Sequence, residues 1–182
     1  MEESSKEIQN HLFLTAAITE NINVIKWFIG KCTENKQECY DATKAVDKKG
    51  NTALHLAALF NNNQEIIKYL LALVDREARN RHQQTPFLLA VENNSNLEVC
   101  KLLYKDQSDL TAKDENGDTA LHLAAALDTN QEIIEYLLEQ GADREARGQH
   151  YQTPFQKAVI HNSNLEVCKL LYKDQSDLAA ED

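Results

Sequence analysis

The stretch NSNLEVCKLLYKDQSDL fills residues 94–110 and recurs, letter for letter, at residues 162–178. A single active site has no use for a second tandem copy of itself. Stacked repeats do need such copies, because each unit presents the same face to its neighbour. The duplication therefore indicates an array of repeats.

Each copy belongs to a larger unit whose two halves carry a threonine at the same place. TALH begins at Thr52 and at Thr119, and TPF begins at Thr85 and at Thr153. Successive threonines are 33, 34 and 34 residues apart. The basic unit is therefore a repeat of thirty-odd residues.

The apolar pattern within each unit predicts two helices. A polar, turn-like stretch precedes the threonine, a short Leu/Ala run follows it, and a polar break leads to a longer apolar run. In that longer run Ile66, Ile67, Leu70 and Leu71 are spaced i, i+1, i+4, i+5, which is a helical stripe and not the alternation of a strand. We therefore predict a helix, a tight loop, a second helix and an extended connector in every unit.

A Thr-Pro pair marks the predicted start of the first helix in two units. Thr85 and Thr153 can accept a hydrogen bond from an early helical amide. Pro86 and Pro154 suit the first helical position, where a missing N–H costs nothing.

The unit at residues 119–147 carries the most informative motifs: TALHLAA, then EIIEYLL, then GAD. In order and spacing it resembles the ankyrin repeat. The resemblance implies an all-α fold, an ankyrin-repeat solenoid of paired antiparallel helices with β-turn fingers, in about five repeats. The predicted repeats are residues 1–46, 47–79, 80–113, 114–147 and 148–182.

The first of these repeats is degenerate. Residues 7–31 have the two-helix spacing without the Thr-Pro start, which suggests an N-terminal capping repeat. Its connector, residues 30–50, is longer than the family pattern, so we expect a protruding loop that holds Cys32 and Cys39.

Several residues depart from the ankyrin pattern. Leu88 and Gln156 replace its histidine, so the usual hydrogen-bond network is expected to be absent there. Gln83 and Tyr151 replace its turn glycine, which predicts altered finger geometry. All four full units also carry an extra residue between their helices.

Composition and charge exclude several classes of partner. The 182 residues are 42% apolar and 26% charged, with a net charge of −10. No cluster of Lys and Arg is present that could displace counterions from phosphate, so neither nucleic acid nor a membrane is expected as a partner. A basic or apolar protein segment fits this charge better. The acidic start, MEESSKEIQN, lacks the features of a secretory signal, so we expect a cytoplasmic protein.

The four cysteines favour free thiols, because the chain is not a short, cysteine-dense secreted domain. Cys100 and Cys168 lie two repeats apart, about 20 Å at the usual spacing of packed helices, which is too far for a disulfide. For Cys32 and Cys39 a disulfide, or two ligands to zinc, stays open beside free thiols. No nearby Cys or His set supplies the remaining ligands of a closed zinc site.

No constellation of catalytic residues is found. A Ser-His-acid elbow, a phosphate-binding glycine loop and a His-Glu-x-x-His motif are all absent from the sequence. For His55 and His122 the resemblance to ankyrin repeats implies a structural role. We therefore predict no catalytic, cofactor-binding or metal-binding residues, and a protein that is not an enzyme.

Ankyrin proteins hold their partners with the fingertips and the exposed end of the inner helix, on the concave face. Carried over by position, the finger residues are Lys48, Lys49, Asn51, Arg81, His82, Gln84, Glu115, Asn116, Asp118, Gln149, His150 and Gln152. The inner-helix residues are Leu59, Phe60, Glu92, Asn93, Ala126, Leu127, Ile160 and His161.

Four of the inner-helix positions, Leu59, Phe60, Leu127 and Ile160, are apolar where the family often places polar side chains. Leaving a Phe or Leu in water forgoes about 1.5–3 kcal/mol of burial. There are two alternatives. These side chains pack under a neighbouring repeat, which a longer inner helix would favour if the extra residue between the helices extends it. Or they form an apolar stripe that binds a partner.

The second copy of the duplicated stretch raises a question about its outer face. A terminal repeat normally has a polar outer face, but Val167, Cys168, Leu170 and Leu171 copy interior positions. Two explanations are open. The chain is a segment of a longer protein with further repeats, or this face forms a dimer with another chain.

The sequence thus predicts a non-enzymatic adaptor or inhibitor that binds a partner protein through its concave face and finger loops. One alternative is a self-assembling structural array. Another is an inhibitor of Rel-type transcription factors, suggested by the long first connector and the stretch QQTP at residues 83–86. With 16 Asn, 14 Lys and 5 Arg, and nearly verbatim duplication, the chain is also similar to ankyrin proteins of intracellular bacteria. That similarity implies a host-directed effector in the host cytoplasm.

Overall fold

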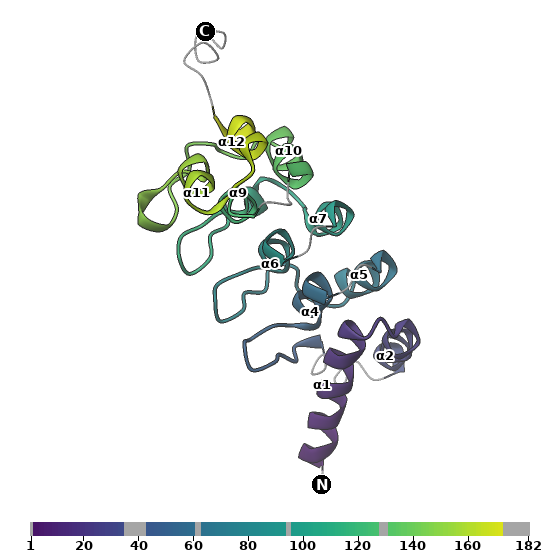
Figure 1. The fold of residues 1–182 in the computed structure, drawn as a ribbon. Helices are drawn as coiled ribbons and strands as arrows, with labels where there is room; N and C mark the ends of the chain where they lie inside the picture. The colour runs from purple at the N-terminus through teal and green to yellow at the C-terminus, as the bar shows by residue number, and fades with distance from the viewer. Residues whose placement is uncertain (1, 35–42, 61–62, 94–95, 128–130, 173–182) are drawn as a thin grey trace. The chain divides into compact units, whose positions relative to one another are not determined.

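The computed structural model describes residues 2–34, 43–60, 63–93, 96–127 and 131–172. Contacts between Cα atoms divide the chain into two compact units, residues 1–104 (unit 1) and residues 105–182 (unit 2). Each unit is described by itself. Every regular element in the described residues is a helix (Figure 1), which confirms the predicted all-α fold class.

Unit 1 is a stack of helical pairs. Its elements are α1 (Glu2–Ile18), α2 (Ile22–Glu34), α4 (Ala53–Phe60), α5 (Gln64–Leu71), α6 (Pro86–Asn93) and α7 (Leu97–Leu103). The inner helices α1, α4 and α6 contact one another in that order, and the outer helices α2, α5 and α7 do the same. The loops that lead into α4 and α6 project to the same side (Figure 1).

Unit 2 repeats this arrangement. Its elements are α8 (Gln107–Thr111), α9 (Ala120–Ala125), α10 (Gln131–Glu139), the 3₁₀ turn η1 (Gln149–Tyr151), α11 (Pro154–His161) and α12 (Leu165–Leu171). Inner helix α9 packs on α11, and outer helix α10 packs on α12. The short helix α8 packs on α9.

The two kinds of helix are buried to different extents, as their sequences require. In α4 residues 53–58 are all buried, and in α9 residues 120–125 are all buried, because small Ala side chains let neighbouring helices approach closely. Outer helix α5 buries only one stripe, formed by Ile66, Ile67 and Leu70. The predicted helical stripe is thereby confirmed. Each buried Leu or Ile contributes about 1.5–3 kcal/mol to folding.

The predicted Thr-Pro starts of two inner helices are also confirmed. The amide of Leu88 donates to Thr85 Oγ1 at 3.2 Å, and the amide of Gln156 donates to Thr153 Oγ1 at 3.3 Å. Pro86 opens α6 and Pro154 opens α11. The proline at the first helical position loses no hydrogen bond there.

The asparagine-rich breaks between helices have a definite structural role. The side chains of Asn63, Asn96 and Asn164 each accept a hydrogen bond, at 3.0 Å, from the amide two residues later. Each Asn is therefore the N-cap of the outer helix that follows, a contact worth about 1 kcal/mol. The breaks are helix start signals as well as loops.

Three expectations from the sequence are wrong in detail. Helix α2 continues to Glu34, so residues 30–34 belong to a helix and not to the connector, which starts later than predicted. The connector after α7 is not fully extended, because it contains α8. Helix α9 ends at Ala125, so Ala126 and Leu127 lie just past its C-terminus and not inside the inner helix.

Some predictions fall outside the described residues. These are Cys39, the side chain of Cys32, and the part of the last predicted repeat beyond residue 172. The five repeat boundaries remain a prediction.

Candidate protein-binding surface

Each finger is a tight turn closed by two backbone hydrogen bonds. In the first finger the amide of Asp47 donates to the carbonyl of Asn51, and the amide of Gly50 donates to the carbonyl of Asp47, both at 3.0 Å. The same two bonds close residues 80–84, 114–118 and 148–152. All four fingers therefore share the same closing hydrogen bonds, and within the last one His150 differs from its equivalents by being left-handed, with φ of 55°.

The expectation of altered finger geometry is wrong for Gln83 and is borne out for the Tyr151 finger, where the neighbouring His150 is left-handed. Gln83 and Tyr151 both adopt the left-handed conformation that a turn glycine would supply, with φ of 59° and 58°. An arginine four residues earlier binds each of them. Arg79 Nη1 donates to the carbonyl of Gln83 at 2.6 Å, and Arg147 Nη1 donates to that of Tyr151 at 3.2 Å. The closing hydrogen bonds are thus kept at the cost of backbone strain.

The first residue of three fingers holds the turn with its side chain. Asp47 Oδ1 accepts from the amides of Lys49 and Asn51, both at 2.8 Å. Asn80 and Asp114 each accept two finger amides in the same way. The last finger begins with Gly148, and there Asp118 Oδ1 accepts the amide of Gln149 at 3.0 Å. Its turn therefore depends on a side chain from the preceding finger.

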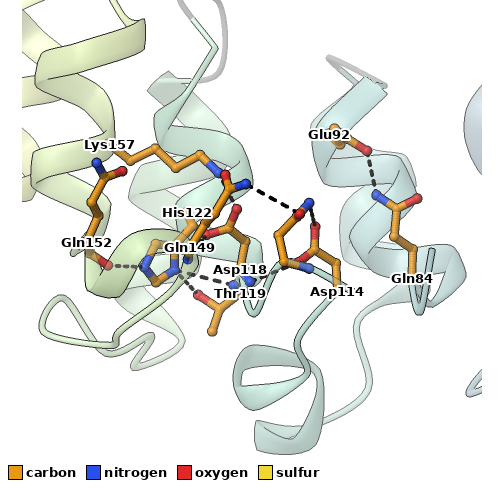
Figure 2. A network of polar contacts seen from close by, with 10 residues as sticks. Gln84, Glu92, Asp114, Asp118, Thr119, His122, Gln149, Gln152 and Lys157 are labelled. Carbon is orange, nitrogen blue, oxygen red and sulfur yellow. Dashed lines mark hydrogen bonds and ion pairs between the residues drawn. The ribbon is translucent and has the colours of Figure 1, made fainter.

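The two histidines tie an inner helix to the next finger. The Nε2 atom of His55 lies 3.0 Å from the carbonyl oxygen of Gln84, and that of His122 lies 3.0 Å from the carbonyl oxygen of Gln152 (Figure 2). A carbonyl only accepts, so Nε2 carries the proton and donates. The Nδ1 atom then accepts from the backbone amide of Thr52 or Thr119. Both histidines are structural, as the resemblance implied.

Burial lowers the pKa of His55 and of His122 below 6.5, and the hydrogen bond to the neighbouring carbonyl opposes this only in part. The neutral imidazole is the form that fits the site, because a protonated Nδ1 would face the threonine N–H. Both histidines are therefore neutral in the folded protein and link neighbouring repeats by hydrogen bonds.

The expectation that Gln156 lacks the histidine contacts is half wrong. Its side-chain Oε1 accepts from the amide of Thr153 at 3.0 Å, and its own amide donates back to Thr153. This reciprocal capping box replaces the local part of the histidine network. Leu88 has no polar side chain and keeps only the backbone bond to Thr85.

A different polar contact links neighbouring repeats in each unit. In unit 1 the side-chain amide of Asn80 donates to Asn51 Oδ1 at 2.9 Å. In unit 2 the ammonium group of Lys157 on α11 is paired with the carboxylate of Asp118 (Figure 2). Both members of that ion pair are buried.

The predicted finger residues divide into buried and exposed groups. The side chains of Asn51, Gln84 and Asp118 are buried. Asn51 is hydrogen-bonded to Asn80, and Gln84 to Glu92. Asp118 forms the ion pair with Lys157. Because these three side chains are buried, they hold the fingers in place. The proposed contact surface therefore consists of the other finger residues. Gln149 and Gln152 are half-buried, and the fully exposed members are Lys48, Lys49, Arg81, His82, Glu115, Asn116 and His150.

The predicted inner-helix residues are also divided. Phe60 and Ile160 are 57% and 58% exposed, whereas Leu59 and Leu127 are half-buried. Glu92 and Ala126 are half-buried, and Asn93 and His161 are exposed. The half-buried Leu59 and Leu127 fit the first alternative, in which the side chains pack under a neighbouring repeat. The exposed Phe60 and Ile160 fit the second, a partner-binding stripe.

The structure adds residues that sequence reasoning missed. Tyr151, Val159 and Ile160, all largely exposed, line a groove with a volume of about 450 Å³ together with Phe155, Arg147 and His150. Val159 was missed because it precedes the position carried over from the family. Tyr151 stood out only as a departure from the turn glycine.

Two cysteines whose side chains the structure describes lie outside this surface. Cys100 and Cys168 are free thiols, and burial raises the pKa of Cys100 to about 12. No cluster of three or more His, Cys, Asp and Glu side chains that could hold a metal occurs in the part of the chain that the structure describes. Among those same residues, no helix combines the length and the apolar character needed to cross a membrane.

The chain matches one family model. The model described as "Ankyrin repeats (3 copies)" matches residues 12–114 and again residues 88–182, so most of the chain is covered. No curated protein sequence matches the chain. Ankyrin repeats generally mediate protein–protein interaction, and the family is typically not enzymatic.

Proposed function

Because the chain belongs to the ankyrin-repeat family, we propose that it is a non-enzymatic adaptor or inhibitor that binds a partner protein through its fingers and inner helices. The partner meets the exposed finger side chains and the apolar ends of the inner helices. Catalytic, cofactor-binding and metal-binding residues have no part in this function.

The observation that carries the proposal is the exposure of Phe60 and Ile160 on inner helices. Phe60 ends α4, where residues 53–58 are all buried, and Ile160 lies near the end of α11, next to the exposed Val159. Interfaces are typically anchored by a few large side chains of this kind, surrounded by polar groups. The exposed Lys48 and Lys49 in unit 1 and His161 in unit 2 supply such polar groups.

The experiment is affinity capture of the partner from a host lysate, followed by affinity measurement with the variant Phe60→Ala. Loss of this anchor is expected to weaken binding at least about tenfold. Leu165→Ala is the matched control, because it removes an exposed apolar side chain from the outer helix α12. Circular dichroism and thermal unfolding confirm that each variant is folded. Unchanged affinity in folded Phe60→Ala would remove the proposal.

A self-assembling array is the second candidate, and one comparison favours it. The two copies of LEVCKLL differ in exposure: Leu97 and Cys100 are half-buried and buried, whereas Leu165 is 64% exposed and Cys168 is half-buried. A face of α12 is thus available for a dimer. Light scattering at several concentrations, with Leu165→Asp as the variant, separates the candidates. An oligomer that Leu165→Asp converts to monomer supports self-assembly, and a monomer at all concentrations supports the adaptor.

Composition and motifs support two more specific roles. The Asn and Lys bias and the duplication support a host-directed effector that acts in the host cytoplasm, and the stretch at residues 83–86 supports a Rel-type inhibitor. The identity of the captured protein decides between them. The net charge of −10 supports a basic or apolar partner segment.

A further inference from the structure

A groove beside the last finger gathers exposed apolar side chains of unit 2. It runs between the finger at residues 148–152 and helix α11, and its apolar lining is Tyr151, Phe155, Val159 and Ile160. Tyr151 is 84% exposed, and Val159 is 60% exposed. Large side chains left in water forgo the free energy of burial, so a cluster of them in one groove favours a binding site.

Tyr151 occupies a strained position in its finger. It stands where Gly50 and Gly117 stand in two other fingers, and it adopts the left-handed conformation that glycine reaches without strain. The preceding residue, His150, is left-handed as well, with φ of 55°. Strain of this kind persists at functional sites, where the side chain is needed for another purpose. An exposed ring on a strained turn fits a contact residue.

The charge of the groove differs from the charge of the whole chain. The net charge of the chain is −10, yet none of the described residues that line the groove is Asp or Glu. The cationic or protonatable lining groups are Arg147 and His150. Arg147 donates one hydrogen bond to the carbonyl of Tyr151, and a guanidinium has further N–H groups that can bind a carboxylate. The groove thus combines an apolar floor with a cationic edge.

We infer that this groove binds a protein segment that carries a large apolar side chain next to an Asp or Glu. The apolar side chain lies against Tyr151, Val159 and Ile160, and the carboxylate pairs with Arg147. This inference rests on the proposed function and narrows its partner, because a cationic edge selects an apolar and acidic segment over a basic one. A small-molecule site would bury most of its ligand in a concave pocket, whereas most of the groove side chains are exposed.

The test begins with panning of phage-displayed random peptides on the whole chain. The selected peptides are expected to share a large apolar residue with an acidic residue close to it. A labelled synthetic peptide from this set is then compared with its own amide version, in which Asp or Glu is replaced by Asn or Gln. The amide version should bind about fivefold more weakly, or worse, and raised salt should shrink the difference.

Substitutions in the chain locate the bound peptide. Tyr151→Gly and Ile160→Ser should each weaken binding at least about tenfold. Tyr151→Gly removes the ring and relieves the strain, and thermal unfolding checks that the variant is folded, so that a loss of affinity is assigned to the missing ring. The matched controls are Gln83→Gly in the equivalent finger of unit 1 and Leu165→Ala on α12, and both should change affinity by less than about twofold.

Four results would overturn the inference: no peptide is enriched, the enriched peptides are basic, the amide version binds equally well, or binding survives both groove substitutions. A concentration-dependent dimer that Tyr151→Gly dissociates would also overturn it, because a second copy would then fill the groove. These results leave the proposed function standing if the captured partner still loses affinity for the Phe60→Ala variant.

Discussion

The carboxylate of Asp118 and the ammonium group of Lys157 form an ion pair between repeats, although 39 residues separate them in the chain. Asp118 is 1% exposed and Lys157 is 9% exposed. At the position of Lys157 the other inner helices carry Leu56, Leu89 and Leu123. The pair therefore places a charged side chain on α11 where the other inner helices carry leucine.

Removal of one partner of this pair should be strongly destabilising. Asp118→Ala leaves the Lys157 ammonium buried without its counter-charge, and Lys157→Leu leaves the carboxylate in the same condition. Each is expected to cost about 3–5 kcal/mol of unfolding free energy, measured in urea. The double variant Asp118→Asn, Lys157→Leu copies the residues of unit 1 and should lie within about 1 kcal/mol of the parent chain. Single and double variants of equal stability would show that the charges do not interact.

Stability should fall as the pH drops below about 6.5, because of His55 and His122. In the unfolded chain each imidazole titrates near 6.5, and in the folded chain burial lowers the pKa. Between the two values the unfolded state binds more protons, so stability rises with pH and is fully present above about 6.5. The slope reaches at most about 1.4 kcal/mol per pH unit for each histidine. Urea unfolding at several pH values measures it.

His122→Gln is the matched variant for this pH effect, because Gln156 already forms the capping box in an equivalent position. It should remove the contribution of His122 to the slope while it keeps the local cap. A slope unchanged in the double variant His55→Gln, His122→Gln would assign the pH dependence to other groups.

Relief of the strained turns should stabilise the protein. Tyr151→Gly and Gln83→Gly each remove a side chain from a left-handed residue. A gain of about 1 kcal/mol is expected for each, less the entropy that glycine adds to the unfolded chain. Thermal unfolding measures the gain. A loss of stability on Tyr151→Gly would mean that the ring is needed for packing and not for a partner.

Gly148 should not tolerate a methyl group. A Cβ atom at this position would lie 2.7 Å from the His122 ring and would also meet Asp118 Oδ1. Gly148→Ala should therefore cost about 1–3 kcal/mol, since buried groups would have to shift. At Gly30, inside α2, a Cβ would meet nothing within 4 Å. Gly30→Ala is the control and should stabilise the helix by about 0.5–1 kcal/mol.

The two copies of the same cysteine should differ in reactivity. Cys100 is fully buried with a pKa raised to about 12, and Cys168 is half-buried. In a Cys32→Ser, Cys39→Ser chain, iodoacetamide should label Cys168 at least about tenfold faster, because Cys100 reacts only after local opening. Trypsin separates the two sites into peptides of different length, so mass spectrometry can follow both. Equal rates would show that the two environments are alike.

The helices could be predicted because their signals are local. The apolar stripe of Ile66, Ile67 and Leu70 and the cap at Thr153 depend on residues within one or two turns of each other. Helix ends were predicted less well. Helix α9 stops at Ala125 although its Leu/Ala run continues to Leu127, and α2 runs beyond its predicted end at residue 31 to Glu34.

The binding surface could be predicted only in part, because exposure depends on partners distant in sequence. Asn51 meets Asn80, and Asp118 meets Lys157, across 29 and 39 residues. In the sequence these polar finger residues look the same as the exposed Lys48. Lys157, in turn, looks like an ordinary surface lysine until α11 is placed on α9. The spacing of the threonines shows which repeats follow one another but not which side chains meet.

The unlike contacts of Asn51 and Asp118 have a consequence for how the chain finds its native order. Nearly identical hairpins can compete for the same neighbour while the protein assembles. A misplaced α11 would bring a lysine ammonium against the Asn51 amide, and a misplaced α6 would bring Leu89 against the Asp118 carboxylate. Each exchange leaves a charge without its counterpart, so the difference between Asn51 and Asp118 favours the assembly of α6 on α4 and of α11 on α9.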